Sequence, residues 1–211
     1  MNQNPNNLIL IGYRATGKST LAALLAEKLG WDAIDSDVLI EQKAGKSIAR
    51  IFAEDGEPAF RDLESDVIAE VLCSSRLEIP EAEHGSPVSQ GGCARPKAAA
   101  HTGCGMQKNR IVLATGGGVP VRPANRELLR KHGFVVWLKA LPETILARMS
   151  SDPTTGERRP NLTNLPPLGE IEHVLQTREP FYRETAHLEI DTEGRTLPEI
   201  AADLFMFNFG T

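Results

Sequence analysis

The fold of this chain is decided by residues 8–20, LILIGYRATGKST. An apolar run ends at Gly12, and the tetrapeptide GKST (17–20) comes directly before a helical pattern, LAALLAEKL. Glycines let the backbone bend around a phosphate chain, and the N-terminus of the following helix directs its N–H groups at the anion. The pattern G-x-x-x-x-G-K-[ST] between a buried strand and a helix therefore predicts a phosphate-binding loop (P-loop, residues 12–20). A glycine-rich turn that happens to precede a helix is the alternative interpretation.

The composition limits the kind of protein. With 211 residues, 41% of them hydrophobic, the chain has the size of one ordinary domain with a real core. No apolar run approaches the ~20 residues that span a bilayer, and the polar start MNQNPNN differs from a secretory signal. Three cysteines form no regular disulfide framework, so we expect a cytoplasmic protein without a membrane partner. The net charge of −5 provides no overall field for nucleic acid, so no nucleic-acid partner is expected.

Two carboxylates follow the second predicted strand. Ala33 and Ile34 form a short apolar segment that leads into Asp35-Ser36-Asp37 and then into a helix. Open α/β sheets bind ligands at the carboxyl ends of their strands. One carboxylate could orient Mg²⁺, directly or through water, and the other could accept a proton from a substrate hydroxyl. Alternatively, Ser36 or Asp37 only caps the helix that follows.

Residues 48–72 predict two helices that are separated by a break at Asp55-Gly56. Arg61 lies on the second helix, three residues before Glu64. An i, i+3 pair of this kind is usually a solvated surface contact. From its local surroundings alone, Arg61 would be assigned to the exterior.

The chain changes character over residues 76–109, where Gly, Pro, Ala and Ser dominate. Such a segment has little apolar surface to offset its ordering entropy, so we expect a flexible insertion in a single domain that spans residues 1–211. Within it, His84, Cys93, His101 and Cys104 suggest a zinc site, but their spacing matches no compact ligand pattern.

A third buried strand, 111–113, leads to Gly116, Gly117 and Gly118, the glycine triplet. Consecutive glycines at the carboxyl end of a strand let the main chain approach a ligand closely, although a flexible turn is also possible. A further buried strand follows at 134–139.

Residues 150–168 are polar and rich in helix breakers, with Arg158 and Arg159 at the centre. They predict a mobile lid that could close basic side chains over phosphates, or else an ordinary solvated loop. A last strand is expected at 187–191. Strands that alternate with helices form a parallel sheet covered on both faces, which is the α/β class.

Taken in order, these motifs resemble the shikimate kinases, a nucleoside-monophosphate-kinase-like branch of the P-loop kinases. The resemblance implies a five-stranded parallel sheet in the order 2-3-1-4-5, flanked by helices and carrying a mobile lid. It also implies transfer of the γ-phosphoryl group of ATP to the 3-hydroxyl of shikimate, in chorismate and aromatic amino-acid biosynthesis. The motifs that carry it are GYRATGKST (12–20), DSDVLIE (35–41), SIARIFAEDGEPAFRDLE (47–64), TGGGV (115–119), RRP (158–160), REPFYRETA (178–186) and IDT (190–192).

The resemblance implies roles at the ATP end of the site. Lys18 would contact the transferring group, and Arg159 would reach the ATP phosphates from the lid. Arg148 and Arg195 would lie near the adenine. The segment that holds ATP would consist of Ala15, Thr16, Gly17, Lys18, Ser19 and Thr20.

At the acceptor end, Ser19 and Asp35 would hold Mg²⁺, and Asp37 would orient or deprotonate the attacking hydroxyl. Planar, bidentate guanidinium groups suit a small carboxylate. Two arginines would therefore grip the carboxylate of shikimate, and a glycine backbone would pack on the same substrate. The implied substrate-binding set is Asp37, Arg61, Gly117 and Arg178.

Departures from the family pattern keep other hypotheses open. Ala15 stands where the family usually has a third P-loop glycine, and the stretch from Arg148 to Arg159 looks longer than usual. A sister kinase acting on gluconate or a nucleoside monophosphate is one alternative. An interaction module that binds ATP without catalysis is another. No long amphipathic stretch is left over for a partner, so we expect a monomer.

Overall fold

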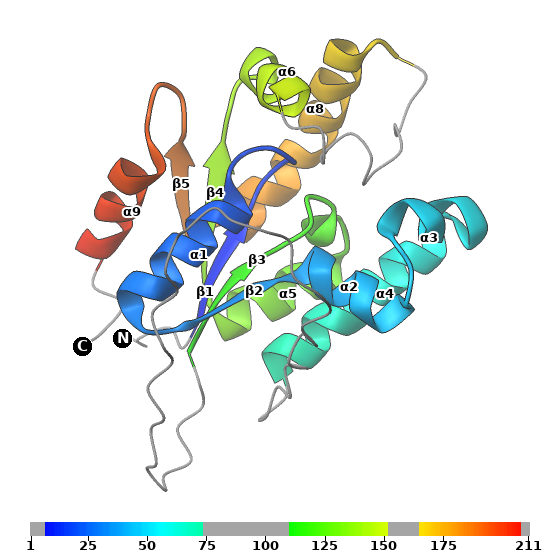
Figure 1. Cartoon of the computed structure of the whole chain (residues 1–211), viewed down its shortest axis with the longest axis horizontal. Coiled ribbons are helices and arrows are strands. Elements are labelled where there is room, and N and C mark those ends of the chain that lie inside the picture. The colour runs from blue at the N-terminus through cyan, green and yellow to red at the C-terminus, as the bar shows by residue number, and fades with distance from the viewer. Residues whose placement is uncertain (1–6, 74–109, 152–164, 208–211) are drawn as a thin grey trace, which may run out of the picture.

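A computed structural model describes residues 7–73, 110–151 and 165–207 of the chain. Within these ranges, five parallel strands form one sheet in the order β2-β3-β1-β4-β5 (Figure 1). The order and the parallel direction confirm the fold predicted from the sequence. The strands are β1 Asn7–Ile11, β2 Asp32–Asp35, β3 Ile111–Ala114, β4 Phe134–Lys139 and β5 Leu188–Asp191.

Helices connect the strands, and two of them begin earlier than predicted. The first helix starts at Lys18 because Gly17, in a left-handed conformation, ends the loop directly before it. The stretch from Glu170 to Arg178 predicts a further helix before the last strand, and this helix, α8, starts at Pro167, since proline fits the first turn of a helix. The helices are α1 Lys18–Leu29, α2 Ser36–Ala44, α3 Ile48–Glu54, α4 Gly56–Cys73, α5 Pro123–His132, α6 Pro142–Ser151, α8 Pro167–Thr185 and α9 Leu197–Met206, with a 3₁₀ turn, η1 Val119–Val121.

The hydrophobic core lies on both faces of the sheet, and alternate residues of β1 point to opposite sides. Leu8 and Leu10 pack with α1 and α9, whereas Ile9 and Ile11 pack with α4, α5 and α8. All four of these β1 side chains are fully buried. Figure 1 shows the two helical layers on either side of the sheet. The central strand is therefore held rigidly, and so is the turn at its carboxyl end.

Several sequence predictions lie outside the described residues. These are the insertion at 76–109, with His84, Cys93, His101 and Cys104, and most of the lid, with Arg159. No helix among the described residues is long and apolar enough to cross a membrane.

A histidine at the edge of the sheet makes the fold sensitive to pH. The Val135 N–H donates to Nδ1 of His187 at 3.0 Å, which requires an unprotonated Nδ1. Burial and the nearby Arg130 charge lower the pKa of His187 below its usual 6.5. The unfolded chain therefore takes up this proton at a higher pH than the folded chain does. The contribution of His187 to stability is present above about pH 6.5 and is lost as the pH falls below it.

We predict that His187→Asn flattens the pH dependence of stability between pH 7 and 5. The amide oxygen of asparagine can accept the same hydrogen bond and does not titrate in this range. The measurement is the free energy of unfolding in urea at several pH values. His173→Asn, an exposed position on α8, is the control and should keep the wild-type slope. An unchanged slope in His187→Asn would contradict the assignment.

Candidate active site

The P-loop turns sharply between β1 and α1. Gly12 has a φ of 140°, and a Cβ there would lie 2.5 Å from the carbonyl oxygen of Leu138 on β4. Gly17 has a φ of 88°. These conformations suit glycine and bring the loop to the N-terminus of α1, where backbone N–H groups and the helix dipole favour an anion. The local geometry is that of the predicted phosphate site.

Lys18 lies folded against this loop with only 8% of its surface exposed. Its Nζ donates to the carbonyl oxygen of Tyr13 at 2.6 Å. The hydroxyl of Thr16 donates to the same carbonyl oxygen at 2.8 Å. Both side chains therefore close the loop on itself and hold the ammonium group beside the backbone that would surround a phosphate.

The start of α1 and the end of β2 are joined by a carboxylate. Asp35 Oδ1 accepts the N–H of Asp37 at 2.9 Å, so Asp35 caps α2. Asp35 Oδ2 accepts the hydroxyl of Ser19 at 2.5 Å. The alternative interpretation, in which Ser36 or Asp37 only caps this helix, is wrong. Ser36 instead accepts the N–H of Gly116 at 2.9 Å, which ties β2 to the glycine triplet.

The hydroxyl of Ser19 and the carboxylate of Asp35 form a pair of hard oxygen ligands at the phosphate site. No group of three or more His, Cys, Asp or Glu side chains in the described ranges could hold a metal by itself. Magnesium commonly uses one or two protein oxygens together with substrate phosphates and water. The residues present fit such an ion.

The glycine triplet makes room for Arg61. A Cβ on Gly118 would overlap the Arg61 guanidinium group. A Cβ on Gly117 would lie 3.2 Å from the carbonyl oxygen of Gly12, so the triplet also packs on the P-loop backbone. The flexible-turn interpretation of these glycines is therefore wrong, because close contacts with other segments account for them.

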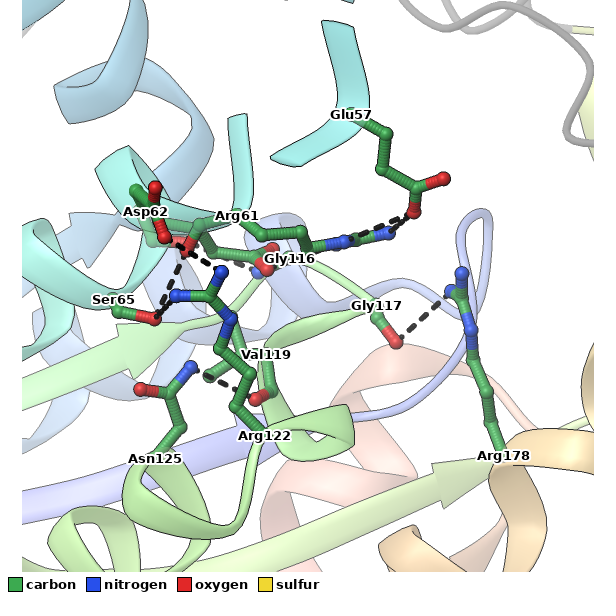
Figure 2. A network of polar contacts seen from close by, with 12 residues as sticks. Glu57, Arg61, Asp62, Ser65, Gly116, Gly117, Val119, Arg122, Asn125 and Arg178 are labelled. Carbon is green, nitrogen blue, oxygen red and sulfur yellow. Dashed lines mark hydrogen bonds and ion pairs between the residues drawn. The ribbon is translucent and has the colours of Figure 1, made fainter. Parts of the chain in front are cut away.

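Arg61 is largely buried, and assigning it to the exterior was also wrong. Its side chain is 11% exposed and pairs with the 1% exposed Glu64 at 2.8 Å. It also pairs with Glu57 at 3.0 Å (Figure 2). Burial opposes the charge on the guanidinium, but Glu64 and Glu57 outweigh it and raise the pKa of Arg61 above its usual value. The two carboxylates hold a permanently charged group toward the glycine triplet.

Arg178 reaches the same triplet from α8. Its Nη1 donates to the carbonyl oxygen of Gly117 at 3.2 Å (Figure 2). Tyr182 Oη donates to the same oxygen at 2.6 Å. Arg178 is 9% exposed and Tyr182 is fully buried. The structure therefore brings Arg61 and Arg178 to neighbouring glycines, although these arginines are far apart in the sequence.

The remaining basic residues are placed differently. Arg148 donates from α6 to the Thr192 hydroxyl at 3.1 Å and to the Ala15 carbonyl oxygen at 3.5 Å, so it links the P-loop to the turn after β5. Arg195, in that turn, pairs with Asp203 of α9 at 2.5 Å. Arg159 lies outside the described residues. Arg148 thus adjoins the P-loop, whereas Arg195 is directed toward α9.

Sequence reasoning missed three supporting residues. Ser36 and Tyr182 hold the glycine triplet, and Glu170 pairs with Arg14 of the P-loop at 3.0 Å. Tyr182 lies within the REPFYRETA motif but had no assigned role. No local pattern identifies Glu170, because its partner is 156 residues away.

The fold, the P-loop and the buried arginines together define a P-loop small-molecule kinase. The family model described as "Shikimate kinase" matches residues 14–79 and 99–207 of this chain. The chain belongs to the shikimate kinase family, as the sequence motifs predict. Residues 80–98, between the two matched segments, fall inside the predicted insertion.

Individual relatives agree with this assignment. A shikimate kinase of Rhodopirellula baltica is 40% identical over 200 residues, which are 95% of this chain and 89% of the relative. One of Symbiobacterium thermophilum is 36% identical over 94% and 93% of the two chains. The solved shikimate kinase from Acinetobacter baumannii in complex with shikimate has a TM-score of 0.74 and 32% identity, and the match covers 96% of this chain and 92% of that one. These findings confirm the enzyme class, while the roles of individual residues stay predictions.

Ala15 has a φ of 59°, the one positive value at a non-glycine residue among the described residues. A left-handed conformation costs an L-residue about 1–2 kcal/mol, and glycine avoids this cost. Glycine also gives the unfolded chain more conformational entropy, which offsets part of the gain in stability. We predict that Ala15→Gly raises the free energy of unfolding by about 0.5–1 kcal/mol. Urea unfolding gives this value directly.

Ala23→Gly is the matched control, because Ala23 is exposed inside α1. There the same substitution should lower stability by about 1 kcal/mol, since glycine is a poor helix former. A loss of stability in Ala15→Gly comparable to that in Ala23→Gly would show that position 15 carries no strain.

Proposed function

We propose that this chain transfers the γ-phosphoryl group of ATP to the 3-hydroxyl of shikimate, giving shikimate 3-phosphate and ADP. Family membership supports the reaction. The observation that carries the proposal is the approach of two largely buried arginines, Arg61 and Arg178, to the neighbouring glycines Gly118 and Gly117, of which Gly117 packs on the P-loop. A small carboxylate held there would lie beside a bound triphosphate.

The ATP phosphates would be held by the backbone of residues 15–20. In this scheme Lys18 leaves the Tyr13 carbonyl oxygen and moves its charge to the transferring group. Arg159 would add a second charge from the lid. Phosphoryl transfer depends mainly on alignment and on neutralising the charge of the phosphate oxygens, and these side chains provide such charge. Arg195 would contribute near the adenine after exchanging its partner Asp203.

Mg²⁺ is the metal that this site would take. Ser19 and Asp35 would hold it through their oxygens, which already lie together in the fold. When bound, the ion neutralises charge on the phosphate oxygens of ATP.

The acceptor would be fixed by charge and by hydrogen bonds. Arg61 and Arg178 would bind the carboxylate of shikimate in planar, bidentate fashion. Asp37, in the first turn of α2, would accept a hydrogen bond from the attacking hydroxyl and take its proton as the phosphoryl group transfers. The backbone at Gly117 would pack on the ring.

All of these groups come from one chain, which supports a monomer as the active form. The cytoplasmic location stays a prediction from the sequence.

The test is ADP release by the purified chain with ATP, Mg²⁺ and a panel of acceptors: shikimate, gluconate and a nucleoside monophosphate. We expect turnover with shikimate that needs Mg²⁺, and little with the others. The ring of shikimate holds its carboxylate and hydroxyls in a fixed arrangement, whereas gluconate is a flexible open chain and a nucleoside monophosphate has no carboxylate for the two arginines. Turnover with gluconate or the nucleotide, but not with shikimate, would reject the proposal. ATP binding with no transfer to any acceptor would indicate a binding module instead.

Gly118→Ala should weaken shikimate use selectively. The added methyl group would displace the guanidinium of Arg61, and loss of a charge-assisted carboxylate contact of about 1.5–3 kcal/mol corresponds to a rise in KM of roughly tenfold or more. The KM for ATP should stay within about threefold, because the P-loop keeps its own contacts. Steady-state kinetics with each substrate varied in turn provides both values.

Gly169→Ala serves as the control for Gly118→Ala. Position 169 lies in α8, where a Cβ would meet Leu165 Cβ no closer than 3.8 Å. This variant should behave like the wild type. If Gly118→Ala also left the KM for shikimate unchanged, Arg61 would not be a ligand of the acceptor.

A further inference from the structure

One buried ion pair joins the P-loop to the helix that carries Arg178. Arg14 Nη2 lies 3.0 Å from Glu170 Oε1, and the two side chains are 15% and 1% exposed. Glu170 is in the first turn of α8, where the helix dipole also favours a negative charge. Arg14 lies within the P-loop, between Gly12 and Gly17. The pair therefore connects the predicted phosphate site to the helix that carries Arg178.

The surroundings of this pair show two different kinds of contact. Tyr13, the neighbour of Arg14, packs in an apolar cluster with Ile171 and Val174 of α8. The Arg14 guanidinium carbon lies 5.5 Å from the centre of the Tyr13 ring. Apolar packing holds the P-loop onto α8 but is not directional. A charge-assisted hydrogen bond in a buried place fixes distance and angle.

Arg178 is on the same helix as Glu170, eight residues further on. At 1.5 Å per residue, this is about 12 Å along the helix axis. A rigid helix that is fixed at Glu170 is therefore also fixed at Arg178. Burial raises the pKa of the Tyr13 hydroxyl above its usual value, and the charges of Arg14, Glu170 and Arg178 lie close enough to shift that pKa as well, so all three side chains surround one P-loop residue.

We propose that the Arg14–Glu170 pair is a positioning device that fixes the P-loop against α8, and so aligns the bound triphosphate with the acceptor held by Arg178. The inference rests on the proposed function. Neither side chain is assigned contact with a substrate. In-line transfer requires the attacking oxygen and the phosphorus to meet within a narrow range. A misplacement of about 1 Å can cost roughly 100-fold in rate.

A purely structural role for the pair makes a different prediction. Replacing a buried ion pair by apolar residues of similar volume is often neutral or stabilising, whereas removing one partner leaves an unpaired buried charge. The double variant Arg14→Met/Glu170→Leu should therefore fold even where the single variants fail. If the pair only stabilises the fold, this variant should also react like the wild type.

The experiment compares Arg14→Met, Glu170→Leu and the double variant in the full chain. The measurements are melting temperature, equilibrium Kd for ATP and for shikimate, single-turnover phosphorylation of shikimate, and ATP hydrolysis without acceptor. For the double variant we expect a near-normal melting temperature and Kd values within about threefold. We expect phosphorylation of shikimate to fall at least about tenfold, while acceptor-free hydrolysis stays within about threefold, because only alignment is lost.

Arg126→Met is the control at the other end of α8, although its partner Glu184 is 59% exposed and Arg126 also donates to the carbonyl oxygens of Pro120 and Val121. Arg126 is 12% exposed, and its Nε lies 3.0 Å from Glu184 Oε2, so this pair joins α5 to the other end of α8. The variant should keep the wild-type rate of single-turnover phosphorylation. An equal loss of rate in Arg126→Met would overturn the inference, since it would show that any loosening of α8 has this effect.

Two other results would also overturn it. Wild-type phosphorylation by the double variant would leave the pair a structural role only. A parallel fall of phosphorylation and acceptor-free hydrolysis would mean that the P-loop itself is damaged. Phosphorylation of shikimate by the unmutated chain distinguishes a failure of this inference from a failure of the proposed function. If the unmutated chain does not phosphorylate shikimate, the function is wrong, and if it does, the variants decide the role of the pair.

Discussion

The site depends on backbone segments that meet at the carboxyl edge of the sheet without room for side chains between them. A Cβ on Gly12 would lie 2.5 Å from the Leu138 carbonyl oxygen, and one on Gly117 would lie 3.2 Å from the Gly12 carbonyl oxygen. The P-loop, the end of β4 and the glycine triplet are therefore in direct contact. Because these segments are fixed to one another, the phosphate cradle and the surroundings of Arg61 have a defined relative position.

Buried charges add direction to this framework. Arg61 is held by Glu64, Arg14 is held by Glu170, and Arg178 donates to the glycine triplet. Buried ion pairs of this kind contribute little net stability, because desolvation offsets their attraction. Their value in an enzyme is that the charged groups are already oriented before a substrate arrives, so little reorganisation is needed during the reaction.

Much of the architecture could be predicted because it has local signatures. The buried strand before Gly12, the break at Gly56 and the strand at 134–139 follow from hydrophobic runs and turn residues, and the structure contains them. The strand order came from the family resemblance and is confirmed. Two interpretations from local sequence failed: the alternative in which Ser36 or Asp37 caps α2, where Asp35 is the cap, and the exterior position that the local surroundings of Arg61 suggest. In each case a contact with a distant part of the chain decides where the side chain lies: Ser36 accepts from Gly116, and Arg61 lies against Gly118.

The sequence by itself determined the P-loop, the alternation of strands and helices, and the residue types able to bind phosphate, metal and carboxylate. Periodicity and turn chemistry are properties of neighbouring residues, so they can be read along the chain. Only the tertiary structure decided that Arg61 lies under Gly118 and that Arg14 meets Glu170, 156 residues away. Such contacts depend on how layers of the fold pack together, and no short stretch of sequence carries that information.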